Sequence, residues 1–271
     1  MLFRSYVIMK SRSERERNVS SIFRKGAAKV YACEMSEVVI NELKSISEQA
    51  AGIKVFDTTW PIAGGGTEIT SNFMQALVHN GSYFAGALLD GKVIGAAFGF
   101  IGNHGGLHLH SHMAAVLPEY RDLNIGTKLK FHQYDWARSH NLPFITWTFD
   151  PLVKRNARLN ILKLGVDVAS YHPNFYGAMI DDLNAGDESD RLMARWEISD
   201  RGPVSRDEMT EIPRDAMTIE IPEDIVEIRM LDPQKSITYR HEVRNKFQSA
   251  LQNGYSVIGF SNTHGYVLEK K

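Results

Sequence analysis

A short polar turn between a strand-like and a helix-like segment is the first place where this sequence could do chemistry. The turn, Arg-Asp-Leu-Asn-Ile-Gly-Thr, covers residues 121–127, and helical spacing of apolar residues begins at Ile125. Asn124 and Gly126 tolerate unusual backbone angles. Such a turn aims several free backbone N–H groups at one point, where the positive end of the helix dipole attracts an anion. With Arg121 at its rim, the turn predicts a cradle for phosphate or pyrophosphate.

Three histidines alternate along the strand-like segment before this turn. His108, His110 and His112 lie within residues 107–116, so a strand would project all three from one face. A neutral imidazole can take a proton from an amine near neutral pH, directly or through water. Zinc sites on strands also use His-x-His, which makes a His-ligated metal hydrolase an alternative. Simple hydrogen bonding of these histidines within a half-buried strand is the other alternative.

Both segments contribute to a family resemblance. Residues 116–126, Val-Leu-Pro-Glu-Tyr-Arg-Asp-Leu-Asn-Ile-Gly, resemble the acyl-CoA signature of the GNAT N-acyltransferases. That signature reads Arg/Gln-x-x-Gly-x-Gly/Ala after a strand ending in Val-x-Pro, and Asn124 stands here in place of the first glycine. Residues 146–152 and 155–165 are similar to a subgroup of predicted GNAT enzymes. The looser resemblance covers residues 30–200.

The resemblance implies an acyl-CoA-dependent N-acyltransferase that uses acetyl-CoA or another acyl-CoA as co-substrate, and no metal. CoA would lie in a cleft between the fourth and fifth strands, which splay apart. Asn156 would contact the cofactor at the start of the helix after the fifth strand. The backbone that would pair with pantetheine and polarise the thioester comprises Ala114, Ala115 and Val116. The residues expected around the pyrophosphate are Arg121, Asp122, Leu123, Asn124, Ile125, Gly126 and Thr127.

The resemblance also implies the catalytic groups. His110 and His112 stand six and four residues before Val116, which is similar to the paired histidines of arylalkylamine N-acetyltransferases. They would form the general base. The family's usual acid is a tyrosine, and Ile161 occupies its expected position here. Tyr176 is the nearest replacement, and an ordinary loop aromatic is the favoured alternative for this residue.

Charged residues after the fifth strand are candidates for substrate binding. Asp150 would either bind the substrate ammonium or cap the helix that begins at Lys154. Arg155 could reach a carboxylate on an amino-acid acceptor or on a succinyl-like donor. Arginines on a solvated helix face remain the alternative reading. The expected partner is a small-molecule amine or an amino acid.

Bulk composition limits the other function classes. The 271 residues are 43% hydrophobic and 23% charged, which is ordinary for a soluble protein. A net charge of −1 provides no basic field for nucleic acid. Cys33 is the single cysteine, which excludes an internal disulfide and suits a reducing cytosol. The apolar run at 93–102 is too short to span a bilayer, and arginines interrupt the N-terminus where a signal peptide is apolar. We therefore expect a cytoplasmic protein without membrane or nucleic-acid partners.

The order of predicted elements matches the GNAT fold, which is α/β (α+β). We expect a mixed, mostly antiparallel sheet whose central strands splay apart. Asp90-Gly91 is a strong hairpin signal between two of the strands. The predicted strands cover residues 31–34, 82–89, 92–101, 107–116, 143–149, 166–171 and 192–198. The predicted helices begin at Ser36 and cover 69–80, 126–141 and 154–164.

We divide the chain into an N-terminal arm at 1–29, a GNAT acyltransferase domain at 30–200 and a small C-terminal α+β extension at 201–271. After a connector rich in charge and proline, the extension should contain a strand at 226–230, a helix at 237–251 and strands at 255–260 and 264–268. It would form a subdomain or extend the main sheet. A non-catalytic CoA-binding sensor is a further alternative function, and a homodimer is one expected assembly.

Overall fold

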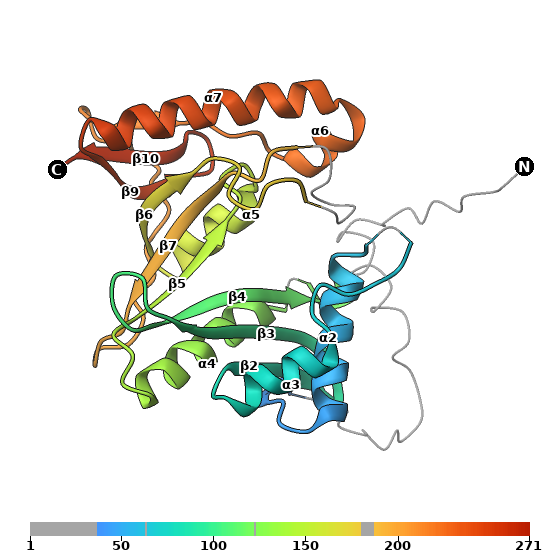
Figure 1. Cartoon of the computed structure of the whole chain (residues 1–271). Helices are drawn as coiled ribbons and strands as arrows, with labels where there is room; N and C mark the ends of the chain where they lie inside the picture. The colour runs from blue at the N-terminus through green and yellow to red at the C-terminus, as the bar shows by residue number, and fades with distance from the viewer. Residues whose placement is uncertain (1–36, 63, 122, 180–186) are drawn as a thin grey trace, which may run out of the picture. The chain divides into compact units, whose positions relative to one another are not determined.

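The main sheet has seven strands in the order β1-β2-β3-β4-β5-β7-β6 (Figure 1). The computed structural model describes residues 37–62, 64–121, 123–179 and 187–271. Neighbouring strands pair antiparallel except β4 and β5, which are parallel. The strands are β1 (Val39–Glu42), β2 (Tyr83–Leu89), β3 (Lys92–Gly102), β4 (His108–Val116), β5 (Phe144–Phe149), β6 (Asp167–His172) and β7 (Arg191–Glu197). The predicted fold class, a mixed and mostly antiparallel sheet, is confirmed.

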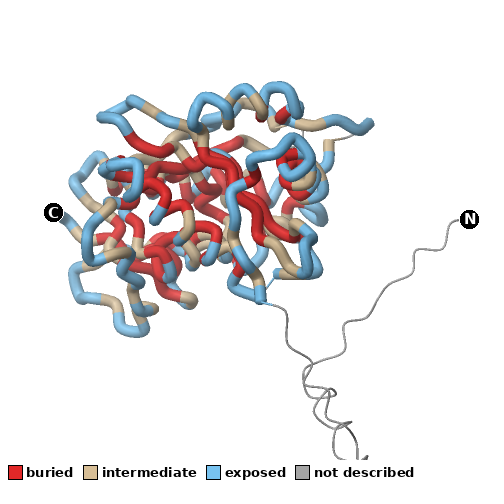
Figure 2. The backbone as a smooth tube through the Cα atoms, turned by 90° about the horizontal axis from the view of Figure 1, so that it is seen from below, coloured by how far each residue is buried: buried red, intermediate tan, exposed pale blue. Residues whose placement is uncertain are grey.

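Helices cover both faces of this sheet. Side chains alternate between the two faces of a strand. On β2, Tyr83 packs into a core cluster with Leu129, whereas Phe84 packs into a second cluster with Ile53. The helices that contribute to these clusters are α2 (Ile46–Thr59), α3 (Ser71–His79) and α4 (Ile125–Ser139). Since Leu129 belongs to α4 and Ile53 to α2, these two helices lie on opposite faces of the sheet. Figure 2 shows the buried residues in red, gathered in the interior of the described part of the chain.

The start of the described chain differs from the prediction. The strand predicted at 31–34 and the arm at 1–29 lie outside the described residues. The helix predicted from Ser36 is wrong, because residues 39–42 form β1 and α2 begins only at Ile46. Ser45 and Glu48 form a reciprocal capping box at that point, with the Ser45 amide 2.8 Å from Glu48 Oε2. The apolar spacing is compatible with a helix that starts at either point, and the capping box determines that α2 starts at Ile46.

The later elements follow the sequence more closely. Asp90 and Gly91 both have positive φ, 50° and 77°, as the tight turn between β2 and β3 requires. The helix predicted at 154–164 consists of α5 (Lys154–Ala157) and a π-helical segment, η3 (Arg158–Lys163). It ends at Gly165, with φ of 63°, where a Cβ would lie 1.9 Å from the Val204 carbonyl oxygen. Only glycine fits this position.

The C-terminal segment forms a separate three-stranded sheet in the order β8-β10-β9, rather than an extension of the main sheet. Its elements are β8 (Met217–Ile219), α6 (Ile225–Leu231), α7 (Pro233–Gln252), β9 (Tyr255–Ser261) and β10 (Gly265–Lys270). The strand predicted at 226–230 is wrong, because Asp224 caps α6 by accepting bonds from the amides of Val226 and Glu227. Residue boundaries 30 and 200 stay predictions.

This segment packs closely against the main unit. The Phe247 ring of α7 stacks on Tyr171 of β6, with ring centroids 5.4 Å apart. The buried Tyr266 hydroxyl donates a 2.9 Å hydrogen bond to the Pro151 carbonyl oxygen at the end of β5. Within the described residues, no helix combines the length and the apolar character needed to cross a membrane.

Candidate active site

The parallel pair β4 and β5 forms a fork at the centre of the main sheet. Register pairs join Leu109 to Ile145 and His110 to Thr146, and no others link these strands among the described residues. Both strands continue beyond these pairs, to Val116 and Phe149. The predicted splay of the central strands is therefore confirmed, and backbone groups beyond His110 face a gap in the sheet.

A cavity of about 580 Å³ occupies this gap. Its walls include Ser111 to Ala114 of β4 and Trp147 to Asp150 of the β5 end. Asn156 of α5 also lines it, as predicted for a cofactor contact, while Val226 and Arg229 reach it from α6. The volume lies within the range of small-molecule sites. The cavity is thus built by the sheet, by α4 and α5, and by the C-terminal segment together.

The N-terminus of α4 has the features predicted for an anion cradle. Asn124 takes the left-handed conformation, with φ of 59°, which confirms that it replaces glycine at a strained position. No side chain caps the first turn of α4, so its amides are available to an anion. A Cβ at Gly126 would meet nothing within 4 Å, and Arg121 is exposed nearby in the sequence. Asp122 lies outside the described residues.

The strand histidines separate into two groups. The His108 ring stacks on Phe144, and its Nδ1 lies 2.7 Å from the Gly106 carbonyl oxygen. His110 and His112 instead have ring centroids 6.2 Å apart. His112 is the extra residue of a β-bulge, because its neighbours Ser111 and Met113 pair with adjacent residues of β3. The bulge turns His112 into the cavity wall.

Desolvation lowers the pKa of both histidines of this pair. Desolvation, together with the neighbouring histidines and Lys130, lowers the pKa of His110 to about 4. Desolvation also lowers the pKa of His112. His110 Nδ1 lies 2.9 Å from Thr146 Oγ1, which orients the ring. Two uncharged imidazoles therefore stand beside the fork, each able to accept a proton.

Tyr176 lies close to these histidines. Its ring centroid is 6.4 Å from that of His112, and its hydroxyl is 2.9 Å from Thr148 Oγ1 on β5. The guanidinium of Arg191 lies 5.4 Å from the centre of the Tyr176 ring. Tyr176 and Arg191 both line the cavity. The structure thus brings together His110, His112 and Tyr176, which are distant in sequence.

Comparison with known proteins finds a family match for part of the chain. The profile of the acetyltransferase (GNAT) family matches residues 52–161, which include the fork, the α4 N-terminus and α5. This stretch is therefore similar to a GNAT acetyltransferase domain. Members of this family are acetyltransferase enzymes that bind CoA. No curated protein matches the chain.

Solved structures of acetyltransferases are similar to this chain. One is a GNAT acetyltransferase from Streptococcus pneumoniae, with 16% identity, a TM-score of 0.49, and coverage of 60% of this chain and 100% of that chain. Another is Ard1 from Thermoplasma volcanium, with 16% identity, a TM-score of 0.48, and coverage of 60% and 99%. A third is Arabidopsis thaliana Naa50 in complex with a bisubstrate analogue, with 16% identity, a TM-score of 0.44, and coverage of 58% and 97%.

Asp150 is bound by arginines of the C-terminal segment. Its oxygens accept bonds from Arg240 Nη1 at 2.7 Å and Nη2 at 2.9 Å, and from Arg229 at 3.3 Å. Burial alone would raise the pKa of the Asp150 carboxyl, but Arg240 holds it below its usual value. The predicted cap role is wrong, because Val153 is the N-cap of α5 and no side chain caps it. Ammonium binding by Asp150 stays a prediction.

Sequence reasoning missed several residues of this site. Arg229 and Arg240 meet Asp150 across 79 and 90 positions, a separation that leaves no local signal. Lys130 also lines the cavity, although it is buried. The sequence did contain an indication of this burial, because Lys130 directly follows Leu129 within the apolar stripe of α4. Arg155 lines the cavity as well, which places this predicted substrate residue at the site.

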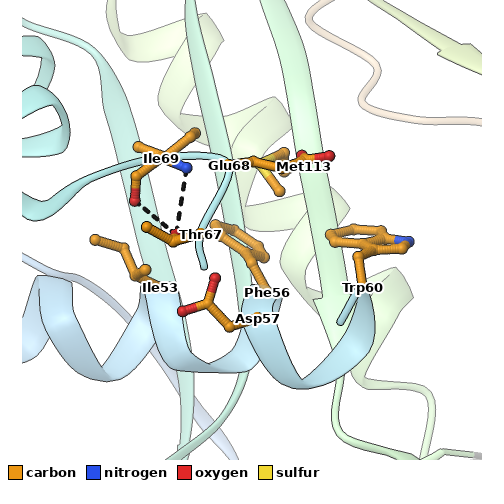
Figure 3. Close-up of a pocket in the computed structure, with 8 residues that line it drawn as sticks. All are labelled: Ile53, Phe56, Asp57, Trp60, Thr67, Glu68, Ile69 and Met113. Carbon is orange, nitrogen blue, oxygen red and sulfur yellow. Dashed lines mark hydrogen bonds between the residues drawn. The ribbon is translucent and has the colours of Figure 1, made fainter. Parts of the chain in front are cut away.

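A small hollow adjoins the cavity on the α2 side (Figure 3). Figure 3 shows the Asp57 side chain rising from α2 toward Thr67, whose Oγ1 is hydrogen-bonded to the Ile69 backbone. The residues that line both spaces are Trp60, Glu68 and Met113. Because these residues are shared, the early helices and the fork form one continuous boundary of the site.

Among residues 37–62, 64–121, 123–179 and 187–271, no three His, Cys, Asp or Glu side chains gather in a group able to hold a metal ion. The His-x-His pattern itself is split, because the His108 ring packs on Phe144 while His112 lines the cavity. The zinc alternative therefore has no supporting geometry in this part of the chain.

Proposed function

We propose that this enzyme is an acyl-CoA-dependent N-acyltransferase that transfers an acetyl or succinyl group directly to the amine of a small molecule or amino acid. One observation carries the proposal: the β4–β5 fork holds a cavity with His112 in its wall, in a domain whose α4 begins with an uncapped, anion-ready turn. Acyl transfer needs a fixed thioester, a polarised carbonyl and a proton acceptor. The cavity between β4 and β5 could hold the thioester, and the backbone and histidines beside it could polarise the carbonyl and accept the proton.

The cofactor side of the reaction would be served by backbone groups. Amides at the start of α4, from Leu123 to Thr127, would hold the pyrophosphate against the positive end of the helix dipole. The free edge of β4 from Ala114 to Val116 would bind the pantetheine arm, because β5 does not pair with it there. An amide of this edge would also polarise the thioester oxygen. Asn156 would add a polar contact from α5.

The acceptor side would be served by the two histidines. An ammonium is not a nucleophile, so the amine must lose a proton before or during attack. His112, with its lowered pKa, would accept that proton directly, and His110 would act with it through water. Tyr176, near His112, would donate to or orient the reacting groups.

The charge of the cavity wall supports an acceptor or donor that bears a carboxylate. Four cationic side chains line the cavity, against two acidic ones, Glu68 and Asp150. The cationic residues are Lys130, Arg155, Arg191 and Arg229. Because Arg229 and Arg240 already bind Asp150, the cations Lys130 and Arg191 favour an anionic group on the ligand. An amino acid, or a succinyl donor, meets this requirement. The proposed location is the cytoplasm, and the protein would act alone or as a homodimer.

The direct test is calorimetry with CoA, followed by an amine and amino-acid panel with acetyl-CoA and succinyl-CoA. Release of the CoA thiol and the mass of the acylated product would be measured together. Binding with turnover supports the proposal. Tight CoA binding without turnover on any amine would instead support the alternative of a CoA-binding sensor, and absence of CoA binding would overturn both.

A further inference from the structure

A buried lysine stands at the apex of the fork. Lys130 Nζ donates a 2.7 Å hydrogen bond to Ser111 Oγ on β4 and lies 3.7 Å from the centre of the Trp147 ring on β5. Ser111 and Trp147 are the first residues after the last β4–β5 register pair, His110 with Thr146. Lys130 therefore bridges the two strands at the point where they part.

No carboxylate of the described residues forms an ion pair with this amine. Besides Ser111 and Trp147, it contacts Gln133 Oε1 at 3.3 Å, and all three partners are neutral. The whole residue is only 5% exposed. A buried ammonium without a carboxylate is costly in free energy. Proteins tolerate this cost in free energy where the buried charge interacts with a bound ligand.

The amine also faces the ligand space. Lys130, Ser111 and Trp147 all line the cavity, and His112 lines it from the next position on β4. Leu109 belongs to the core cluster of α4, so Ser111, two positions on, lies on the α4 face with Lys130. His112 contacts Phe100, which packs on the α2 cluster. A ligand that enters between the strands would thus end with Lys130 on one side and His112 on the other.

We infer that Lys130 is the proton donor to the thiolate that leaves when the acyl group is transferred. The inference rests on the proposed function and deepens it. It also assigns the role of general acid, which Ile161 cannot perform at the position where a tyrosine was expected. Ile161 is fully buried in the core cluster of α4 and lines no part of the cavity.

The step balances as follows. The acceptor nitrogen forms a bond to the thioester carbon, and the C–S bond breaks with its electron pair on sulfur. The Lys130 ammonium gives one proton to that sulfur and becomes a neutral amine. One proton from the attacking nitrogen passes to His112 or to water. Exchange with solvent then returns a proton to Lys130 and removes one from His112, so no net charge accumulates.

The acidity of the lysine suits this role. Burial lowers the pKa of Lys130 to about 7, whereas a free thiol has a pKa of roughly 8.5. Proton transfer from the ammonium to the thiolate is therefore downhill. The titratable group that senses Lys130 is His110, whose pKa the Lys130 charge lowers slightly. The groups that contact the amine itself, Ser111, Gln133 and Trp147, do not titrate in this range.

The test is the pH dependence of kcat. Wild-type protein, Lys130→Met and the control Lys128→Met would each be assayed between pH 6 and 9. Lys128 is exposed on the same helix and carries the same charge. We expect the ratio of the control's kcat to that of Lys130→Met to fall as pH rises through about 7, because the Lys130 ammonium then loses its proton. The ratio of the wild-type kcat to that of the control should stay constant.

The size of kcat, compared with the Kd for CoA, gives a second readout. Lys130→Met should lose on the order of a hundredfold in kcat, with the Kd for CoA within about twofold of the wild type. A pH profile and a kcat that are both unchanged in Lys130→Met would overturn the inference while leaving the proposed function intact. Failure of the wild type to bind CoA would instead overturn the proposed function. Circular dichroism would verify that the variant is folded, which we expect because methionine is similar in size and removes a buried charge.

Discussion

Two buried cations of this protein have opposite environments. Arg240, 1% exposed, joins the C-terminal segment to the end of β5 and donates to two carboxylates, Asp150 and Asp187. Lys130, at the fork, contacts only neutral partners among the described residues: Ser111, Gln133 and Trp147. Buried charges normally need partners, because the interior solvates them poorly. The paired cation holds the fold together, and the unpaired one is available to a ligand.

The comparison also explains why the cavity sits where it does. Arg229 and Arg240 bind Asp150, which is part of the β5 end of the cavity wall. The segment after residue 200 is therefore a structural part of the site, since Val226 and Arg229 of α6 line the same cavity. The GNAT family match ends at residue 161, so this contribution is a feature of the present chain beyond the matched region.

The largest effect should come from breaking the paired site. Arg240→Met leaves Asp150 and Asp187 without their main partner, and an uncompensated buried charge costs about 3–5 kcal/mol. The free energy of unfolding, measured in urea, should fall by that amount. Lys246→Met, which removes an exposed charge from the same helix, should change it by less than about 0.5 kcal/mol. Equal stability of the two variants would contradict the distinction between the paired and unpaired cations.

The next effect concerns the anion cradle at α4. Gly126→Asp would place a carboxylate in the open space above the helix N-terminus, where the pyrophosphate is proposed to bind. Calorimetry should show CoA affinity reduced on the order of a hundredfold or more, to the limit of detection. Gly126→Ala adds only a Cβ and is the control, with a smaller loss. Normal CoA binding by Gly126→Asp would refute the cradle.

The sequence predicted the parts of the site that depend on local chemistry. Asn124 was predicted to replace a glycine because Asn is one of the few residues that tolerate a left-handed conformation. The splay of β4 from β5 was predicted from the family resemblance. The β-bulge that turns His112 into the cavity was not predicted, because alternation along a strand assumes an unbroken register. The prediction of a strand at 226–230 was wrong because a short apolar run is compatible with both a strand and a helix. The side chain of Asp224 caps the N-terminus of α6 and so favours the helix.

Contacts between distant residues could not be predicted. Asp150 meets Arg240 only after α7 has folded across the sheet, and no spacing in the sequence encodes that meeting. Lys130 was visible as a lysine within an apolar stripe, but a stripe alone does not say whether the amine reaches solvent. The difference between the paired and unpaired cation therefore emerges from tertiary structure.

A third effect tests the proton acceptor on the opposite side of the fork from Lys130. The double variant His110→Gln/His112→Gln should lose on the order of a hundredfold in kcat, the usual contribution of a positioned base. Its CoA affinity should be unchanged, because the α4 N-terminus is untouched. Partial rescue at higher pH is expected, since more of the amine then arrives neutral.

The pH profile of the wild type sharpens this prediction. A base must be unprotonated, and burial lowers the pKa of His110 to about 4 and that of His112 in the same direction. The loss of kcat on acidification should therefore occur below the pH at which a free imidazole titrates, roughly 6.5. Full activity of the double variant at neutral pH would remove both histidines from the mechanism.

The smallest effect tests the unpaired cation directly, without any ligand. Burial lowers the pKa of Lys130 to about 7, whereas the unfolded chain keeps the ordinary lysine pKa of about 10.4. Between these values the unfolded state binds one more proton than the folded state, so the free energy of unfolding should rise with pH. Below about pH 7 both states are protonated and this contribution is constant. Lys130→Met lacks the group and should lack the rise.

The measurement is urea unfolding at several pH values between 6 and 9, for the wild type, Lys130→Met and Lys128→Met. Other groups titrate in this range, but they are common to all three proteins and cancel in the differences. The curve of Lys128→Met should run parallel to that of the wild type, because Lys128 is exposed. The curve of Lys130→Met should start above or level with the wild type at pH 6 and lose its advantage as pH rises. Parallel curves for all three proteins would show that Lys130 finds a counterion, and the contrast with Arg240 would then fail.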